Sequence, residues 1–93
     1  MRMKELPGDV KIYSSSPVFT KASVPKNLLS AHATKPGVWG MLIVQSGALT
    51  YSILGDSVES IRLEAGDAGV IEPTVRHFVT PEGEVEFFVE FYK

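Results

Sequence analysis

Apolar residues occupy every second position near the C-terminal end of the chain, which is the pattern of a β-strand with one buried face. Over Val85–Tyr92 the two alternating sets are Val85, Phe87, Val89, Phe91 and Glu86, Phe88, Glu90, Tyr92. Successive side chains of a strand point to opposite faces, so the first set is expected in the core. The second set is a mixed face that combines aromatic rings with two carboxylates.

Further runs rich in β-branched and aromatic residues are separated by turn residues, about 8–12 positions apart. A hairpin is predicted from strands Trp39–Gln45 and Ala48–Leu54, joined by a turn at Ser46-Gly47. The other predicted elements are strands at Val10–Tyr13, Pro17–Thr20, Ser57–Leu63, Ala68–Glu72 and His77–Thr80, a turn at Pro81–Glu84 and a helical turn after Pro25. Nothing alternates strands with helices, so the turn spacing predicts an all-β sandwich or small barrel.

The length of the chain suits one compact domain. With 93 residues it is too short for two domains, and we assign 1–93 to a single one. A domain of this size buries only about 60% of the surface of its unfolded chain. The chain has no cysteine, so no disulfide or thiolate zinc cluster supplements the core. We therefore predict a homodimer, in which a second copy buries additional surface.

The charge and hydropathy of the chain exclude several classes of partner. Nine Lys and Arg residues against eleven Asp and Glu give a net charge of −2, which provides no basic field for nucleic acid or an anionic membrane. No apolar run approaches the roughly 20 residues of a membrane-spanning helix. The N-terminal stretch MRMKELPGDV has no hydrophobic segment that could act as a secretion signal. We predict a cytoplasmic protein whose partner is a small molecule.

Two histidines and two glutamates are the candidates for chemistry. His32 and His77 are the only histidines, and Glu72 and Glu90 lie on or beside predicted strands. Two imidazoles with one or two carboxylates match the ligand set of Zn, Mn, Fe or Ni. The opposing interpretation is that both histidines are ordinary hydrogen-bonded side chains and that Glu90 lies in water. Only the fold could bring His32 and His77 together, because they are far apart in the sequence.

Other reaction classes have no matching motif. No serine lies in a G-x-S-x-G elbow, and the chain contains neither a G-x-G-x-x-G nor a P-loop sequence. Catalysis would therefore have to be acid–base or metal-assisted. The residues leave open whether the protein is an enzyme or a binding module.

The stretch GDAGVIEPTVRH resembles the second conserved motif of cupins. Gly66 matches the glycine of that motif and His77 its histidine, while Glu72 occupies the usual place of a proline. The first cupin motif is degenerate. Gly40 stands where a ligand glutamate is expected, and His32 lies slightly ahead of the usual histidine pair.

A longer segment narrows this resemblance to one subgroup. The stretch PVFTKASVPKNLLSAHATKPGVWGMLIVQSGALTY, together with EPTVRH and VEFY, is similar to the tellurite-resistance-related cupin family. The same kind of domain forms the N-terminal part of some TehB proteins, ahead of a methyltransferase. This chain has no room for that enzyme, so methyl transfer is not expected. The resemblance implies a double-stranded β-helix, the jelly-roll barrel of antiparallel strands that cupins share.

The ligands of cupins converge inside the mouth of the barrel. The resemblance therefore implies that a divalent metal, a small ligand such as an oxyanion, or both bind at His32 and His77. Either Glu72 or Glu90 would complete such a site.

Two alternatives stay open beside the metal site. A metal-free module would bind a small ligand in an apolar pocket lined by Trp39, Phe88 and Tyr92, with the histidines as hydrogen-bond partners. An interaction or regulatory domain without catalysis would instead have a barrel filled by its own side chains, with no cavity.

Overall fold

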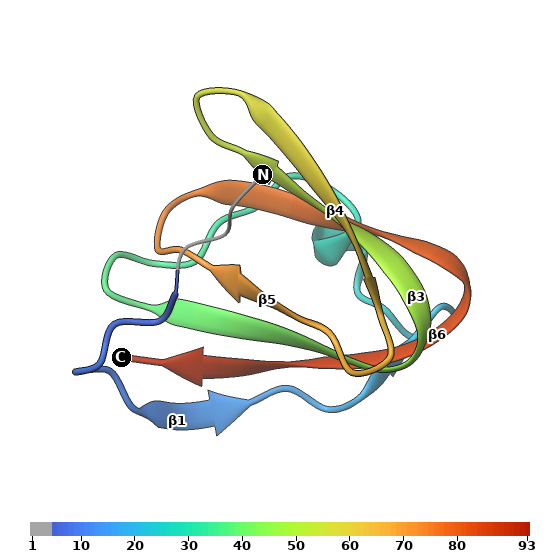
Figure 1. The fold of residues 1–93 in the computed structure, drawn as a ribbon, viewed down its shortest axis with the longest axis horizontal. Helices are drawn as coiled ribbons and strands as arrows, with labels where there is room; N and C mark the ends of the chain where they lie inside the picture. The colour runs from blue at the N-terminus through green and yellow to red at the C-terminus, as the bar shows by residue number, and fades with distance from the viewer. Residues whose placement is uncertain (1–4) are drawn as a thin grey trace.

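Two long strands, β3 and β6, cross the whole molecule and carry most of its pairing (Figure 1). The computed structural model describes residues 5–93. In chain order the elements are β1 (Ile12–Ser15), β2 (Phe19–Thr20), the 3-10 helix η1 (Lys26–Leu28), β3 (Trp39–Leu54), β4 (Val58–Glu64), β5 (Ala68–Ile71) and β6 (Arg76–Tyr92). All strand pairs among the described residues are antiparallel. The all-β prediction is therefore confirmed.

The two long strands form the centre of the sheet, and the short strands cover different parts of them. The order is β1-β6-β3-β4, with β2 paired to β6 and β5 paired to β3. Residues 40–43 of β3 pair with β5, whereas residues 48–54 pair with β4. β6 pairs with β3 along both of these parts. The result is one curved antiparallel sheet with β3 and β6 at its centre and the short strands paired along their outer sides (Figure 1).

The predicted turns at Ser46-Gly47 and Pro81–Glu84 are bends inside continuous strands. The β3–β6 register shifts on both sides of Gly47, which marks β-bulges at this point. Gly47 has a φ of +71°, a conformation that residues with a Cβ rarely adopt. A bulge raises the local twist and lets a strand bend without ending. The predicted two-strand hairpin from Trp39 to Leu54 is therefore wrong, because both segments belong to β3.

The core lies on the inner face of this curved sheet. It consists of Leu42, Val44, Leu49, Tyr51, Leu63, Ile71, Val79, Val85, Phe87 and Val89. The alternation predicted near the C-terminal end is confirmed, because Phe87 and Val89 are buried while the intervening Phe88 is only partly buried. Phe91 packs against the edge of the same core.

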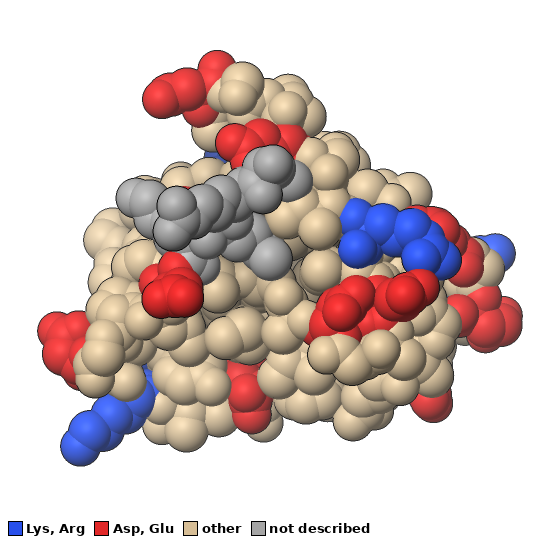
Figure 2. Space-filling view, in the orientation of Figure 1, with Lys and Arg blue, Asp and Glu red and all other residues tan. Residues whose placement is uncertain are grey.

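The surface of the described residues mixes both signs of charge. On the face drawn in Figure 2, the main group of basic side chains lies directly against acidic ones, and the described residues form no continuous basic surface there. The guanidinium of Arg62 on β4 lies 2.7 Å from a Glu64 carboxylate oxygen and 2.9 Å from one of Glu82. These contacts link β4 to the bend of β6. None of the helices in the described part of the chain is long and apolar enough to cross a membrane.

Candidate functional site

The fold brings the two histidines into direct contact. His77 lies near the start of β6, and His32 lies in the segment between η1 and β3. The His32 amide donates to the His77 carbonyl oxygen at 3.0 Å, and the His77 amide donates to the His32 carbonyl oxygen at 2.8 Å. The ring centroids are 4.3 Å apart, and the rings are tilted by 57°. A reciprocal backbone bridge therefore fixes the side-chain pair.

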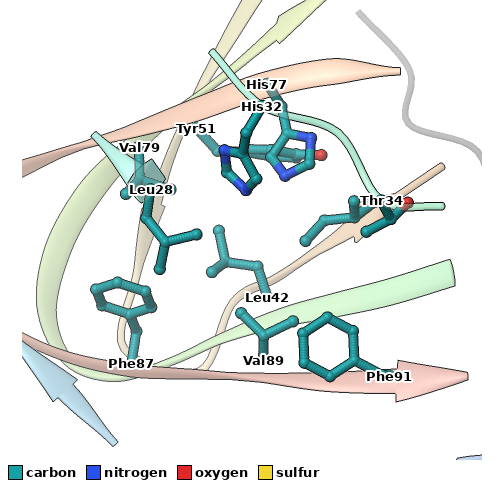
Figure 3. A pocket seen from close by; sticks show the side chains of 11 residues that line it. Leu28, His32, Thr34, Leu42, Tyr51, His77, Val79, Phe87, Val89 and Phe91 are labelled. Atoms are coloured by element: carbon teal, nitrogen blue, oxygen red, sulfur yellow. The ribbon is translucent and has the colours of Figure 1, made fainter. Parts of the chain in front are cut away.

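Backbone hydrogen bonds set the tautomer of both rings. Nδ1 of His32 lies 3.2 Å from the Ser30 carbonyl oxygen, and Nδ1 of His77 lies 3.0 Å from the Val75 carbonyl oxygen. A carbonyl oxygen only accepts hydrogen bonds, so each Nδ1 carries a hydrogen, and Nε2 carries the lone pair whenever the ring is neutral. Figure 3 shows the two rings side by side, each with one nitrogen turned toward a cavity.

This cavity is small and apolar. Its volume is about 40 Å³, which is room for roughly three water-sized groups. Its walls are Leu28, His32, Thr34, Leu42, Tyr51, Ile71, His77, Val79, Phe87, Val89 and Phe91. The polar side chains in this lining are the two imidazoles, Thr34 and Tyr51, and the hydroxyls of Thr34 and Tyr51 already donate to backbone carbonyl oxygens. Such a cavity can hold one compact group of a ligand rather than a whole organic molecule.

A wider groove of about 480 Å³ lies directly outside the cavity. Its lining is Tyr13, Ser14, Asn27, Leu28, His32, Ala33, Thr34, Lys35, Val38 and Phe91. Leu28, His32, Thr34 and Phe91 line both spaces, so they form the boundary between them. The groove has the volume of a small-molecule site, and the cavity extends it inward.

Thr34 ties the wall of the groove to the strands beside it. Its hydroxyl donates to the Val38 carbonyl oxygen at 2.8 Å and lies 3.4 Å from the Glu72 carbonyl oxygen. Its own carbonyl oxygen accepts a hydrogen bond from the Thr74 amide at 3.1 Å. The segment that carries His32 is therefore held at several points.

Tyr51 supports the histidine pair from β3. Its ring is 1% exposed and meets the His77 ring edge-on, with centroids 5.8 Å apart. Its hydroxyl donates to the Val70 carbonyl oxygen at 3.0 Å. Burial, with a smaller contribution from the negative charge of Glu72, raises the pKa of Tyr51, so the phenol stays neutral. Sequence reasoning missed Tyr51, although it shares the inward face of β3 with Leu49 and could have been found by that alternation.

Neither expected carboxylate forms a group of three metal ligands with the two histidines. Glu90 alternates with the cavity residues Val89 and Phe91, so its carboxylate lies on the other face of β6. Glu72 follows the last residue of β5, and its negative charge acts on Tyr51. One Glu90 carboxylate oxygen accepts a hydrogen bond from the Tyr92 hydroxyl at 3.1 Å. Within residues 5–93, no group of three or more His, Cys, Asp or Glu side chains is placed to hold a metal ion.

The predicted pocket residues also lie on the opposite face. Trp39, Phe88 and Tyr92 line neither the cavity nor the groove. Trp39 is directly opposite Tyr92 in the β3–β6 pair, and both are partly buried. The prediction assigned the mixed face of β6 to the ligand, whereas Phe87, Val89 and Phe91 of the apolar face line the cavity.

We expect the domain to lose stability as the pH falls below about 6.5. Burial lowers the pKa of His77 from its ordinary value of 6.5, the charge of His32 lowers it further, and the bond to Val75 opposes this shift. The unfolded chain therefore binds a proton that the folded state resists, so this contribution is complete above pH 6.5 and is lost as the pH falls toward the folded-state pKa.

Urea unfolding at pH 7.5 and pH 5.5 measures this loss. His77→Phe keeps a buried ring but cannot be protonated, so its stability should change less between the two pH values than that of the wild type. An equal change in both proteins would show that another group is responsible.

Solved structures with this fold include both a full-length match and a part of a larger protein. A protein from E. coli (strain K12) has a TM-score of 0.88 and 25% identity, over 98% of this chain and 97% of that one. TehB from Haemophilus influenzae has a TM-score of 0.83 and 29% identity, over 91% of this chain and 32% of TehB. The chain thus spans about a third of TehB.

A more distant structure supports the fold class. A cupin-2 domain containing protein from Shewanella frigidimarina has a TM-score of 0.56 and 20% identity, over 96% of this chain and 76% of that one. At this identity the likeness concerns the fold alone. Together with the antiparallel pairing, it confirms the predicted cupin-like barrel.

Sequence comparison identifies the family. A search of curated proteins finds no match to the chain. The profile of the TehB-like domain matches residues 14–89, which is well over half of the chain and includes both His32 and His77. The resemblance seen in the sequence is confirmed, and the chain belongs to the TehB-like domain family.

Proposed function

We propose that this domain binds a small ligand that places one compact hydrogen-bond donor in the cavity. The observation that carries the proposal is that Nδ1 of both His32 and His77 bonds to a backbone carbonyl oxygen at the wall of one apolar space, which leaves the two Nε2 atoms for a ligand. In such surroundings a polar atom is stabilised by a partner, because few water molecules can reach it. A ligand O–H or N–H would supply that partner, and the rest of the ligand would lie in the groove.

At neutral pH the pair suits a donor better than an anion. Burial lowers the pKa of His77, so its ring is neutral and presents an acceptor. An oxyanion ligand, which the family resemblance suggested, needs donors and would therefore need protonated rings. Its binding would strengthen as the pH falls.

A divalent metal is the second candidate, and the tautomers favour it. Metal-ligating histidines usually donate their other ring hydrogen to a carbonyl or carboxylate oxygen, as Nδ1 does here. His32 and His77 would hold Zn, Fe, Mn or Ni through Nε2. Water or ligand atoms would complete the coordination, because the described residues assemble no third ligand. A metal ion bound there would supply a Lewis acid with open positions.

The remaining alternatives have less support. A purely structural or regulatory domain was expected to have a barrel filled by side chains, whereas this barrel contains a cavity next to a groove. Homodimer formation and a cytoplasmic location stay predictions from the sequence.

Nitrogen-15 NMR of the histidine rings tests the proposal with phenol and anisole as probes. Phenol offers an O–H donor, and anisole is its methyl ether without one. We expect phenol to shift the Nε2 signals of both rings and to bind roughly fivefold more tightly than anisole, which corresponds to one hydrogen bond of about 1 kcal/mol. His32→Phe keeps a ring but removes a lone pair, so this preference should weaken in the variant.

Zn²⁺ titration of the same samples tests the second candidate. Binding of one ion per chain that is lost in both His32→Phe and His77→Phe would support a metal site. His32 is only half-buried, so His32→Phe is the variant expected to keep the wild-type fold. Equal affinity for phenol and anisole, with ring signals that do not respond to Zn²⁺, would overturn both candidates.

A further inference from the structure

The groove outside the cavity carries a positive charge in a chain whose net charge is −2. Lys35 is the one charged side chain among the described residues that line it, and no described Asp or Glu does so. A second cation lies nearby, because the Lys93 ammonium sits 4.3 Å from the centre of the Tyr13 ring, and Tyr13 lines the groove. This local charge favours an anionic group on the ligand.

The backbone of Lys35 is held by a tight turn. The Val38 amide donates to the Lys35 carbonyl oxygen at 3.0 Å, with Pro36 and Gly37 at the two central positions. Gly37 has a φ of +80°, as the third residue of a type II turn requires. Thr34, the preceding residue, is anchored by the three hydrogen bonds described above. The turn therefore fixes the backbone of Lys35 at the groove, and its exposed side chain carries the ammonium from that point.

The floor of the groove offers an apolar surface beside this cation. Leu28, Val38, Phe91 and the Tyr13 ring all line it, and Leu28 and Phe91 continue into the cavity. The side chains of Ser14, Asn27 and Thr34, which also line it, carry no charge. A molecule that fits this surface has an apolar body and a single anionic end.

We infer that the groove recognises a small carboxylate with an apolar or aromatic body, whose carboxylate pairs with the ammonium of Lys35. This inference rests on the proposed function, because the other end of the same molecule would place its donor at His32 and His77. 4-Hydroxybenzoate carries all three features: a carboxylate, a ring and a hydroxyl donor. Its two truncated relatives each lack one end, since benzoate has no hydroxyl and 4-hydroxybenzamide has no charge.

Titrations of the full chain with these three probes, followed by amide NMR signals, test the inference. We expect 4-hydroxybenzoate to shift signals of groove residues such as Ala33 and Val38 and to bind more tightly than 4-hydroxybenzamide. An exposed ion pair predicts that Lys35→Gln weakens 4-hydroxybenzoate roughly two- to fivefold, with a smaller effect at high salt. Lys35→Glu should weaken it further, while neither variant changes the affinity for 4-hydroxybenzamide.

Lys21→Gln is the matched control, because Lys21 is exposed and lines neither space. Equal affinities for the acid and the amide, equal effects of Lys35→Gln and Lys21→Gln, or groove signals that none of the probes moves would each overturn the inference. The proposed function fails separately. If benzoate binds as tightly as 4-hydroxybenzoate and the histidine ring signals do not move, the proposed donor site at His32 and His77 is wrong. The inference that the groove binds a carboxylate at Lys35 would still stand.

Discussion

Gly47→Ala is expected to lower the free energy of unfolding by about 2–5 kcal/mol, the largest effect among the Gly→Ala substitutions in this chain. A Cβ at Gly47 would overlap the Glu84 carbonyl oxygen and would lie 3.0 Å from the Cα of Val85. The backbone there also has a φ of +71°. The steric overlap and the unfavourable φ therefore both occur at the bulge where β3 bends against β6. The overlapping atoms belong to the backbone, so no flexible side chain can move aside.

Substitutions at two other glycines distinguish the steric cost of the added Cβ from the conformational cost of the positive φ. Gly83 has a φ of +73°, and a Cβ at this position would meet no atom within 4 Å, so Gly83→Ala should carry only the conformational cost of about 1 kcal/mol. Gly55 has neither feature, and Gly55→Ala should be close to neutral. Urea unfolding followed by circular dichroism measures all three. A loss at Gly47 no larger than that at Gly83 would mean that β6 does not pass this closely.

Phe87→Ala is expected to cost about 3–5 kcal/mol, which is a large part of the 5–15 kcal/mol typical of a whole domain. The Phe87 side chain is fully buried, and its ring lies 5.7 Å from that of Phe19 on β2. It also forms a wall of the cavity. The variant should therefore unfold at much lower urea concentration and, where folded, have a larger cavity beside the histidines.

Phe88→Ala is the matched control, since it removes the same atoms one position along β6. Phe88 is partly buried on the other face, so its loss should cost less than half as much. Thermal and urea unfolding of the two variants give the comparison directly. If Phe88→Ala were the more damaging change, the mixed face of β6 would be the inner one, and the pocket expected at Phe88 and Tyr92 would be restored.

The alternation of apolar residues predicted the inner face of β6 correctly. The turn residues at Ser46-Gly47 and Pro81–Glu84, however, predicted ends of strands where the structure has bends within β3 and β6. A glycine beside a small polar residue indicates a hairpin turn or a bulge equally well. At Gly47 the choice depends on β6, which pairs with both halves of β3 and keeps them in one strand. Paired residues of β3 and β6 lie from 22 positions apart (Leu54 and Arg76) to 53 positions apart (Trp39 and Tyr92), so no short window of sequence contains the deciding contact.

The histidine pair was predictable only through the family resemblance, because a backbone bridge between distant segments creates it. The position of Glu90 follows from a simpler constraint. Its aromatic neighbours indicate a desolvated carboxylate, yet Val89 and Phe91 occupy the inner face and leave Glu90 on the other. The two-residue alternation of a strand decides to which face a side chain points, whatever metal-ligand chemistry that side chain could offer.

The reciprocal hydrogen bonds between His32 and His77 make the mouth of the barrel a unit of local unfolding. A fluctuation that separates these two backbone segments also separates the two rings. The backbone bridge and the contact between the rings therefore form and break together. A ligand that contacts both rings binds only the closed state and lowers the population of the opened one. Occupancy of the site is therefore coupled to the protection of two backbone amides from exchange with solvent.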